Sequence, residues 1–300
     1  MHIEIKQNAV VPTNDYVFKK IFGQVGNENI TKDFLSTILD KTIESVNLEG
    51  NTILEKDLFD EKIGILDIKA KLDNHVLCDI EMQVVNHRNT EKRILFYWSK
   101  LYSSGIKSGK NYDNLNKTIC ILIANYELSN LKEILKGHTE WKIREKDFKN
   151  TVLTDMLEIH IIELPKIQKL MQKGSFFKED ADFLIWTKFL LMPNELGEFE
   201  MENNKAVKKA KEELDKIQND EYEQRLAELR LKHILDTNSI ESYGYEKGLA
   251  DGKLEIQKEI AKKLLAKGIY IETVSELTGL SIKDGSIILV GVVKCLNFFV

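Results

Sequence analysis

Cysteine and proline are both scarce in this 300-residue chain. The three cysteines, Cys78, Cys120 and Cys295, are far apart and form no CxxC pair. This spacing excludes a zinc finger or zinc ribbon and fits a reducing cytoplasm. With only three prolines and 16 glycines, the composition also argues against long disordered linkers.

The sequence also lacks a signal peptide and a long apolar segment. Residues 1–6 have neither the basic start nor the apolar run of a secretory signal. The longest apolar stretch, 287–300, is broken by Lys294 and Asn297. It is shorter than the roughly 20 residues that a membrane-spanning helix needs. We therefore expect a soluble cytoplasmic protein with no membrane partner.

An excess of positive charge is missing as well. The net charge is −5, from 43 Lys and Arg against 48 Asp and Glu, which excludes a general polyanion binder. One segment departs from this balance: between Asn86 and Lys117, seven basic residues stand against two acids. Such a segment suits contact with DNA phosphates, although a solvated basic helix face has the same composition. The candidates for DNA contact are Arg93, Tyr97, Lys100, Lys107 and Lys110.

Hydrophobic periodicity predicts an α/β fold in the first two thirds of the chain. Apolar residues at helical spacing predict helices, and alternating or continuous apolar runs predict strands. The predicted helices are 14–22, 31–39 and 90–106, and the predicted strands are 62–72, 76–84, 118–124 and 157–164. This order predicts a mixed sheet flanked by helices.

The last third is predicted to be helical. We expect a long charged, solvated helix over 203–235, a polar break at 236–244 and a helix over 245–267 that ends at Gly268. A short helix over 271–277 and a turn at 278–281 then resemble a helix-turn-helix. The predicted division is a domain of residues 1–197, a charged helical connector 198–244, and a helical segment 245–300.

This helical segment is expected to pack or self-associate rather than to read DNA sequence. Gly244, Gly248 and Gly252 recur at four-residue spacing, which fits either close helix contact or a frayed linker helix. The second helix of the helix-turn-helix-like segment offers only Lys283 before it becomes wholly apolar, too little polar surface to reach base edges. We expect a homo-oligomer through these C-terminal helices.

The predicted hairpin brings two acids together. A turn centred on Asn74 pairs apolar residues along one face, for example Ile68 with Ile80. On the other face it pairs Lys69 with Asp79, and it places Asp67 directly opposite Glu81. Gln83, two residues further on, lies on the same face of the strand as Glu81.

Two carboxylates in directly opposed positions repel each other. They can share a proton or a divalent cation, and Mg²⁺ prefers carboxylate oxygens. A cation would lower the pKa of a bound water and stabilise charge on a phosphate, and Gln83 could orient that water. The spacing fits equally a pair of acids that point away from each other into solvent.

These residues carry a family resemblance. Asp67 followed by Glu81-Met82-Gln83 resembles the D…(D/E)XK signature of restriction-endonuclease-like nucleases, with Gln where Lys is usual. The wider chain resembles the Rpn family of recombination-promoting nucleases, also called PD-(D/E)XK nuclease family transposases. The matching stretches are 14–22, 64–67, 80–83, 93–102 (with Trp98 where Tyr is frequent), 109–112, 260–265 and 277–281.

The resemblance implies a restriction-endonuclease-like mixed sheet with a helical C-terminal extension. It also implies a metal-dependent DNA endonuclease that promotes recombination or belongs to a mobile element. Asp67 and Glu81 would bind Mg²⁺, with Mn²⁺ as a substitute, and Gln83 would replace the activating lysine. Asp15 stands where the family has a helix acid, which fits a metal-linked, a capping or a structural role.

Two alternatives to this enzyme stay open. One is a catalytically weak or inactive nuclease fold that binds DNA or assembles, as a transposon remnant. The other is transposition proper, which needs strand transfer as well as cleavage. The chain departs from the family at 287–300, which is apolar where a polar helical end is expected. A frameshifted terminus or a partner-binding tail would explain this.

Overall fold

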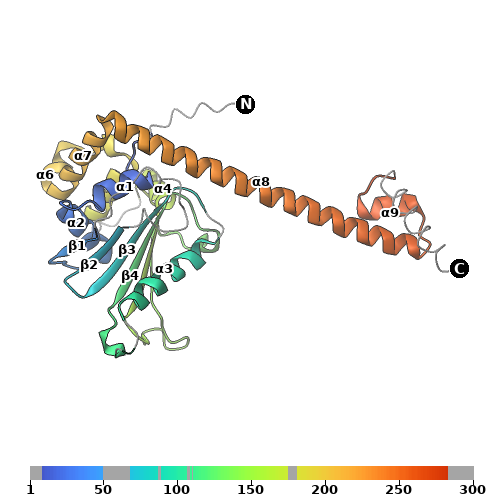
Figure 1. Cartoon of the computed structure of the whole chain (residues 1–300), viewed down its shortest axis with the longest axis horizontal. Coiled ribbons are helices and arrows are strands. Elements are labelled where there is room, and N and C mark those ends of the chain that lie inside the picture. The colour runs from blue at the N-terminus through green and yellow to red at the C-terminus, as the bar shows by residue number, and fades with distance from the viewer. Residues whose placement is uncertain are drawn as a thin grey trace. The chain divides into compact units, whose positions relative to one another are not determined.

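The computed structural model describes residues 9–49, 68–86, 89–106, 109, 111–174 and 181–282. The chain divides into two compact units, residues 1–235 and 236–300. The first unit contains the sheet and its flanking helices (Figure 1).

A six-stranded mixed sheet forms the centre of the first unit. Its strands lie in the order β1-β2-β3-β4-β6-β5. The central strands β3, β4 and β6 are parallel, whereas β1, β2 and β5 pair antiparallel with their neighbours. The bounds are β1 Val46–Leu48, β2 Ile68–Leu72, β3 Val76–Gln83, β4 Thr118–Ala124, β5 His138–Trp141 and β6 Leu157–Glu163. The prediction of a mixed sheet is confirmed.

The β2–β3 hairpin has the predicted register. Ile68 pairs with Ile80 and Lys69 with Asp79. Its turn uses left-handed backbone angles at Asp73 (φ 47°) and Asn74 (φ 64°), which these two residue types tolerate. The predicted beginning of the first strand, 62–67, lies outside the described residues.

Helices cover both faces of the sheet. One face contributes to the main core under α1 (Asp15–Phe22), α2 (Glu28–Leu39), α5 (Ala181–Leu191) and α7 (Lys205–Gln218). The other face packs against α3 (Thr90–Ser104), which contributes Ile94 and Trp98 to a second core. Figure 1 shows α3 on one side of the sheet and α1, α2 and α7 on the other. Two further helices, α4 (Leu164–Lys173) and α6 (Glu198–Asn203), complete this part of the chain.

The prediction of a solvated helix over 203–235 is wrong. Helix α7 buries Val207, Ala210, Leu214 and Ile217 in the main core. The next helix, α8, adds Leu226 and Ala227 to the same core. The apolar residues recur every three or four positions, so that charges fill the outer face of α7 while its inner face is buried. Composition averaged over the segment concealed this pattern.

The predicted polar break at 236–244 is also absent. Helix α8 runs from Glu221 to Ala266 without interruption. The segment contains no proline, and each of its polar residues or glycines lowers helix stability by only about 1 kcal/mol or less. Helix propagation, which adds one hydrogen bond per residue, overcomes such small losses.

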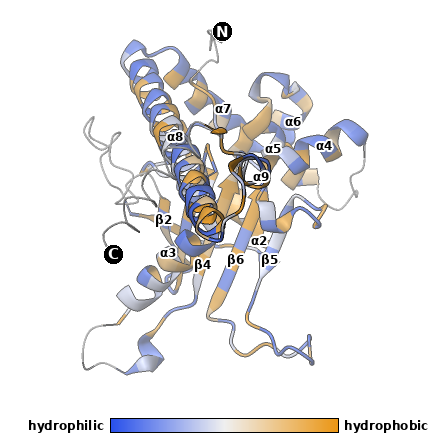
Figure 2. Cartoon of the chain, turned by 90° about the vertical axis from the view of Figure 1, so that its right-hand side faces the viewer, coloured by the Kyte–Doolittle hydropathy of each residue, from blue (hydrophilic) through white to orange (hydrophobic). Residues whose placement is uncertain are grey.

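The second unit confirms the short predicted helix. Helix α9 spans Ile271–Thr278 and ends at Gly279, whose φ is 71°. Ala261, Leu265, Val274 and Leu280 form a small core. Gly244, Gly248 and Gly252 lie in α8 with no described atom within 4 Å of an added Cβ, so close packing at these glycines is not seen within the described chain. Figure 2 shows polar and apolar residues interspersed along α8. Among the described residues, no helix has the length and apolar character needed to cross a membrane.

Candidate active site

Glu81 and Gln83 lie together on the sheet face that α3 covers. They alternate along β3 with Cys78, Ile80 and Met82, which face the main core. Both are buried, with exposed fractions of 8% and 5%. The hairpin therefore places a carboxylate and an amide beneath a basic helix.

Asp67, the predicted partner of Glu81, lies outside the described residues. The described register ends with Ile68 opposite Ile80. The predicted pairing of Asp67 with Glu81 stays a prediction.

One oxygen of Glu81 receives two hydrogen bonds. Gln83 donates from Nε2 to Glu81 Oε1 at 2.8 Å, and Arg93 donates from Nη2 to the same oxygen at 3.2 Å. Arg93 belongs to the first turns of α3. Because both bonds end on Oε1, Oε2 takes part in neither.

The other end of the Gln83 amide is held by two hydroxyl groups. Tyr126 donates to Gln83 Oε1, and Thr90 lies 3.5 Å from the same oxygen and 3.0 Å from the Tyr126 hydroxyl. Sequence analysis missed both residues. Tyr126 follows β4, whose last residue Ala124 pairs with Gln83, so the order of the strands would have revealed it. Gln83 is thus fixed at both ends of its amide.

Negative charge at this face is not fully compensated. Burial raises the pKa of Glu81, as does Asp15, while Gln83 and Arg93 lower it. Burial and the neighbouring Glu81 raise the pKa of Asp79 to about 7, against the opposite effect of Lys69 and Lys19. Asp79 Oδ1 is buried without a hydrogen-bond partner among the described residues. Buried carboxylates with unmet negative charge fit a hard divalent cation.

Asp15 is engaged by other partners. Its Oδ2 accepts from Arg230 Nε at 2.9 Å and Nη2 at 2.7 Å, and its Oδ1 accepts from the Tyr16 backbone N–H at 2.8 Å. The helix cap is Asn14 rather than Asp15. These contacts join α1 to α8, and a metal-linked role for Asp15 stays a prediction.

Comparison with family models gives a match over most of the chain. Residues 12–244 match the model of the PD-(D/E)XK nuclease family transposases. The chain belongs to this family. No curated protein and no solved structure matches it. The six-stranded mixed sheet with flanking helices is consistent with the restriction-endonuclease-like fold of PD-(D/E)XK proteins, as predicted.

Three of the five candidate DNA contacts of this PD-(D/E)XK chain are described, all on α3. Arg93 donates to the Tyr97 hydroxyl at 3.3 Å, and its guanidinium lies 5.7 Å from the centre of the Tyr97 ring. Lys100 is exposed one turn further on. Lys107 and Lys110 lie outside the described residues.

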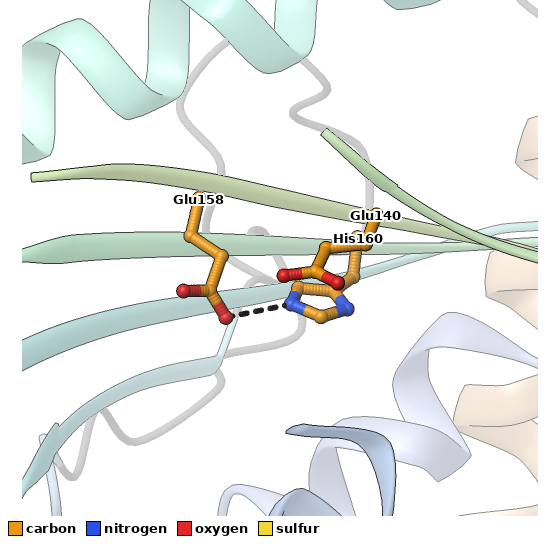
Figure 3. A group of neighbouring side chains, drawn as sticks. All are labelled: Glu140, Glu158 and His160. Carbon is orange, nitrogen blue, oxygen red and sulfur yellow. Dashed lines mark hydrogen bonds and ion pairs between the residues drawn. The ribbon is translucent and has the colours of Figure 1, made fainter. Parts of the chain in front are cut away.

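A second polar cluster occupies the opposite face of the sheet. Glu158, His160 and Glu140 offer potential metal ligands within 4.8 Å of one another, and Figure 3 shows the hydrogen bond between Glu158 and His160, which is 3.0 Å long. Glu158 is paired with Ile119, whose side chain is in the main core. The three ligands are thus separated from Glu81 by the sheet.

Lysines compensate the negative charge of this second cluster. Lys117, Lys41 and Lys142 lie 2.6, 3.5 and 3.7 Å from Glu158. Burial opposes the charged form of Glu158, but His160 and Lys117 hold its pKa well below the usual range. Three cations around one carboxylate disfavour a metal ion there. The cluster is therefore explained as an ion-pair network that joins β5 and β6.

Proposed function

We propose that this protein is a metal-dependent DNA endonuclease that acts in recombination or with a mobile element. The observation that carries the proposal is the buried Glu81, held by Gln83 and Arg93 beside Asp79, whose Oδ1 has no hydrogen-bond partner among the described residues. Family membership supports a nuclease, and buried acids beside a basic helix support phosphodiester hydrolysis.

Asp67 and Glu81 would hold the metal, Mg²⁺ by preference with Mn²⁺ as a substitute. A bound cation would lower the pKa of a water ligand and stabilise negative charge on the phosphate. Gln83 orients the Glu81 carboxylate, and Tyr126 with Thr90 fixes Gln83. This hydrogen-bonded chain holds the carboxylate in place before substrate binds.

DNA would bind along α3 and the segment after it. Arg93, Lys100, Lys107 and Lys110 supply the positive charge, and Tyr97 supplies a hydroxyl and a ring face. Contacts of this kind position the phosphate backbone and carry no sequence information.

One observation favours the alternative of a catalytically weak nuclease fold. Gln83 carries no charge, and its amide is already bonded to Glu81 and Tyr126. It cannot stabilise charge as a lysine would. We therefore expect slow cleavage relative to nucleases that have the lysine.

We further propose self-association through the C-terminal helices. Tyr245, Leu249 and Ile256 on α8 are 54%, 63% and 61% exposed. Exposed apolar side chains on one long helix favour contact between protomers.

Plasmid nicking tests the enzymatic proposal. Supercoiled DNA is incubated with wild type and with Asp67→Ala in Mg²⁺, Mn²⁺ or Ca²⁺. We expect nicking in Mg²⁺ and Mn²⁺ only, and a loss of at least about 100-fold in Asp67→Ala and in Glu81→Ala, because each removes a proposed ligand. Circular dichroism checks that the variants fold. Equal nicking by wild type and Asp67→Ala would contradict the proposal.

A further inference from the structure

The missing lysine of the signature leaves the site without its usual cation. Gln83 stands at that position in the sequence, and an amide neither carries charge nor transfers a proton at neutral pH. A phosphodiester gains negative charge in the transition state, so a nearby fixed cation accelerates its hydrolysis. Another side chain would have to supply the charge.

Arg93 lies in the appropriate place. Its guanidinium is 3.2 Å from Glu81 Oε1, the same oxygen that Gln83 contacts. Tyr97, one helical turn later, holds the guanidinium at 3.3 Å. The Arg93 side chain is still 29% exposed, so that a ligand can reach it while it stays held.

The helix that carries Arg93 is anchored at the site itself. Thr90, one turn before Arg93, is 1% exposed and contacts Gln83 and Tyr126. This anchor fixes the rotation of α3 about its axis and therefore the direction in which Arg93 extends. The position of α3 and the direction of the Arg93 side chain are therefore both set by buried contacts.

Three other cations of this unit, Arg230, Lys19 and Lys69, act on acids other than Glu81. Arg230 pairs with Asp15. Lys19 and Lys69 act on Asp79. Arg93, in contrast, forms an ion pair with Glu81.

We infer that Arg93 supplies the positive charge that Gln83 lacks, by contacting the phosphate that is cleaved. The inference rests on the proposed nuclease function. A guanidinium is always charged and its planar fork matches phosphate oxygens. During hydrolysis the water oxygen bonds to phosphorus, the bond from phosphorus to one sugar oxygen breaks, and that oxygen leaves with the electron pair. One water proton ends on the sugar oxygen and the other stays with the phosphate or passes to solvent. Arg93 neither gives nor takes a proton.

The test separates catalysis from binding. Single-turnover nicking at saturating protein gives the rate, and DNA affinity is measured in Ca²⁺. We expect Arg93→Gln to lower the rate at least about 100-fold and to weaken DNA binding less than about tenfold. The matched control is Lys92→Gln, which removes one charge from an exposed neighbour on α3 and should leave the rate unchanged. Gln83→Lys added to Arg93→Gln should restore the rate at least about tenfold, because it returns a cation to the site.

Two further measurements keep the inference falsifiable. Arg93→Lys keeps the charge but loses the planar fork, so it should be slower than wild type and still at least about tenfold faster than Asp67→Ala. This variant also tests the inference if Arg93→Gln does not fold. Ca²⁺ binding, measured by calorimetry, should tighten several-fold in Arg93→Gln, because a cation is removed from beside Glu81.

Several outcomes would overturn the inference. An unchanged rate in Arg93→Gln, a loss of DNA affinity alone, or a folded Arg93→Lys as slow as Asp67→Ala would each do so. If the wild type does not cleave DNA with any of the metals tested, both the nuclease function and this inference are contradicted. Equal cleavage by wild type and Arg93→Gln would contradict the inference alone.

Discussion

At the scale of single residues, the candidate site places two acids side by side on β3, and the two differ in how many hydrogen bonds they accept. Glu81 has two hydrogen-bond donors on one oxygen, whereas Asp79 has a buried oxygen with none among the described residues. Charge buried without a partner destabilises a fold. This oxygen of Asp79 is the atom at the site that the proposed cation would compensate.

This imbalance predicts how stability depends on pH. The pKa of Asp79 is raised in the folded state to about 7. A group with a raised folded pKa contributes stability below its unfolded pKa, and that contribution is lost as pH rises through the folded pKa. The metal-free protein should therefore lose roughly 1–3 kcal/mol between about pH 4 and pH 7 from this group. Urea unfolding over this range should show a smaller loss in Asp79→Asn. Parallel curves for the two proteins would contradict the assignment.

Sequence patterns could predict part of the site, for clear physical reasons. The apolar pairing of Ile68 with Ile80 specified the hairpin register, because a slip of one residue would turn every apolar side chain outward. Helical spacing likewise brought Arg93 and Tyr97 to one face. Tyr126 could not be found in this way, because its position depends on β4 lying parallel to β3.

At the scale of elements, α1 and the first turns of α8 are joined by polar contacts. Arg230 reaches Asp15, and Glu223 accepts from the Tyr16 hydroxyl at 2.5 Å and from Lys20 at 2.9 Å. Residues 198–235 of the predicted connector therefore lie in the first unit. Charge-rich composition misled the prediction, because a helix with one buried face needs only a few apolar residues per turn.

The ion pair between Asp15 and Arg230 predicts a strong coupling. Both side chains are about nine-tenths buried. Arg230→Met should cost about 3 kcal/mol, because it leaves a buried carboxylate without its ion-pair partner. Asp15→Asn in the same chain should recover much of that loss. A double-mutant cycle from urea unfolding measures the coupling, and strictly additive losses would show that the pair is unimportant.

At the scale of the whole molecule, the family match and the structural units end at different places. The match ends at residue 244 and the first unit at residue 235, while α8 continues to Ala266. The first unit has its own cores on both sheet faces. The catalytic proposal and the self-association proposal therefore concern different parts of the chain.

Truncation separates these two proposals. Deleting the residues after Gly244 should lower the mass measured by light scattering, because exposed apolar residues of α8 are removed. Metal-dependent nicking should stay measurable, because Glu81, Gln83 and Arg93 remain with their supporting helices. If the truncated protein keeps its mass and loses affinity only for particular DNA sequences, the C-terminal segment reads DNA instead.

The short outer strands of the described sheet have a consequence for behaviour at high concentration. β1 has three residues and β5 has four, and β5 is followed by the charged Lys142, which pairs with Glu140. A long exposed strand at the edge of a sheet can pair with strands of other molecules and promote aggregation, whereas short edge strands and charged edges resist it. Fibril growth by strand addition is thus disfavoured, and concentrated samples should stay free of thioflavin-positive material.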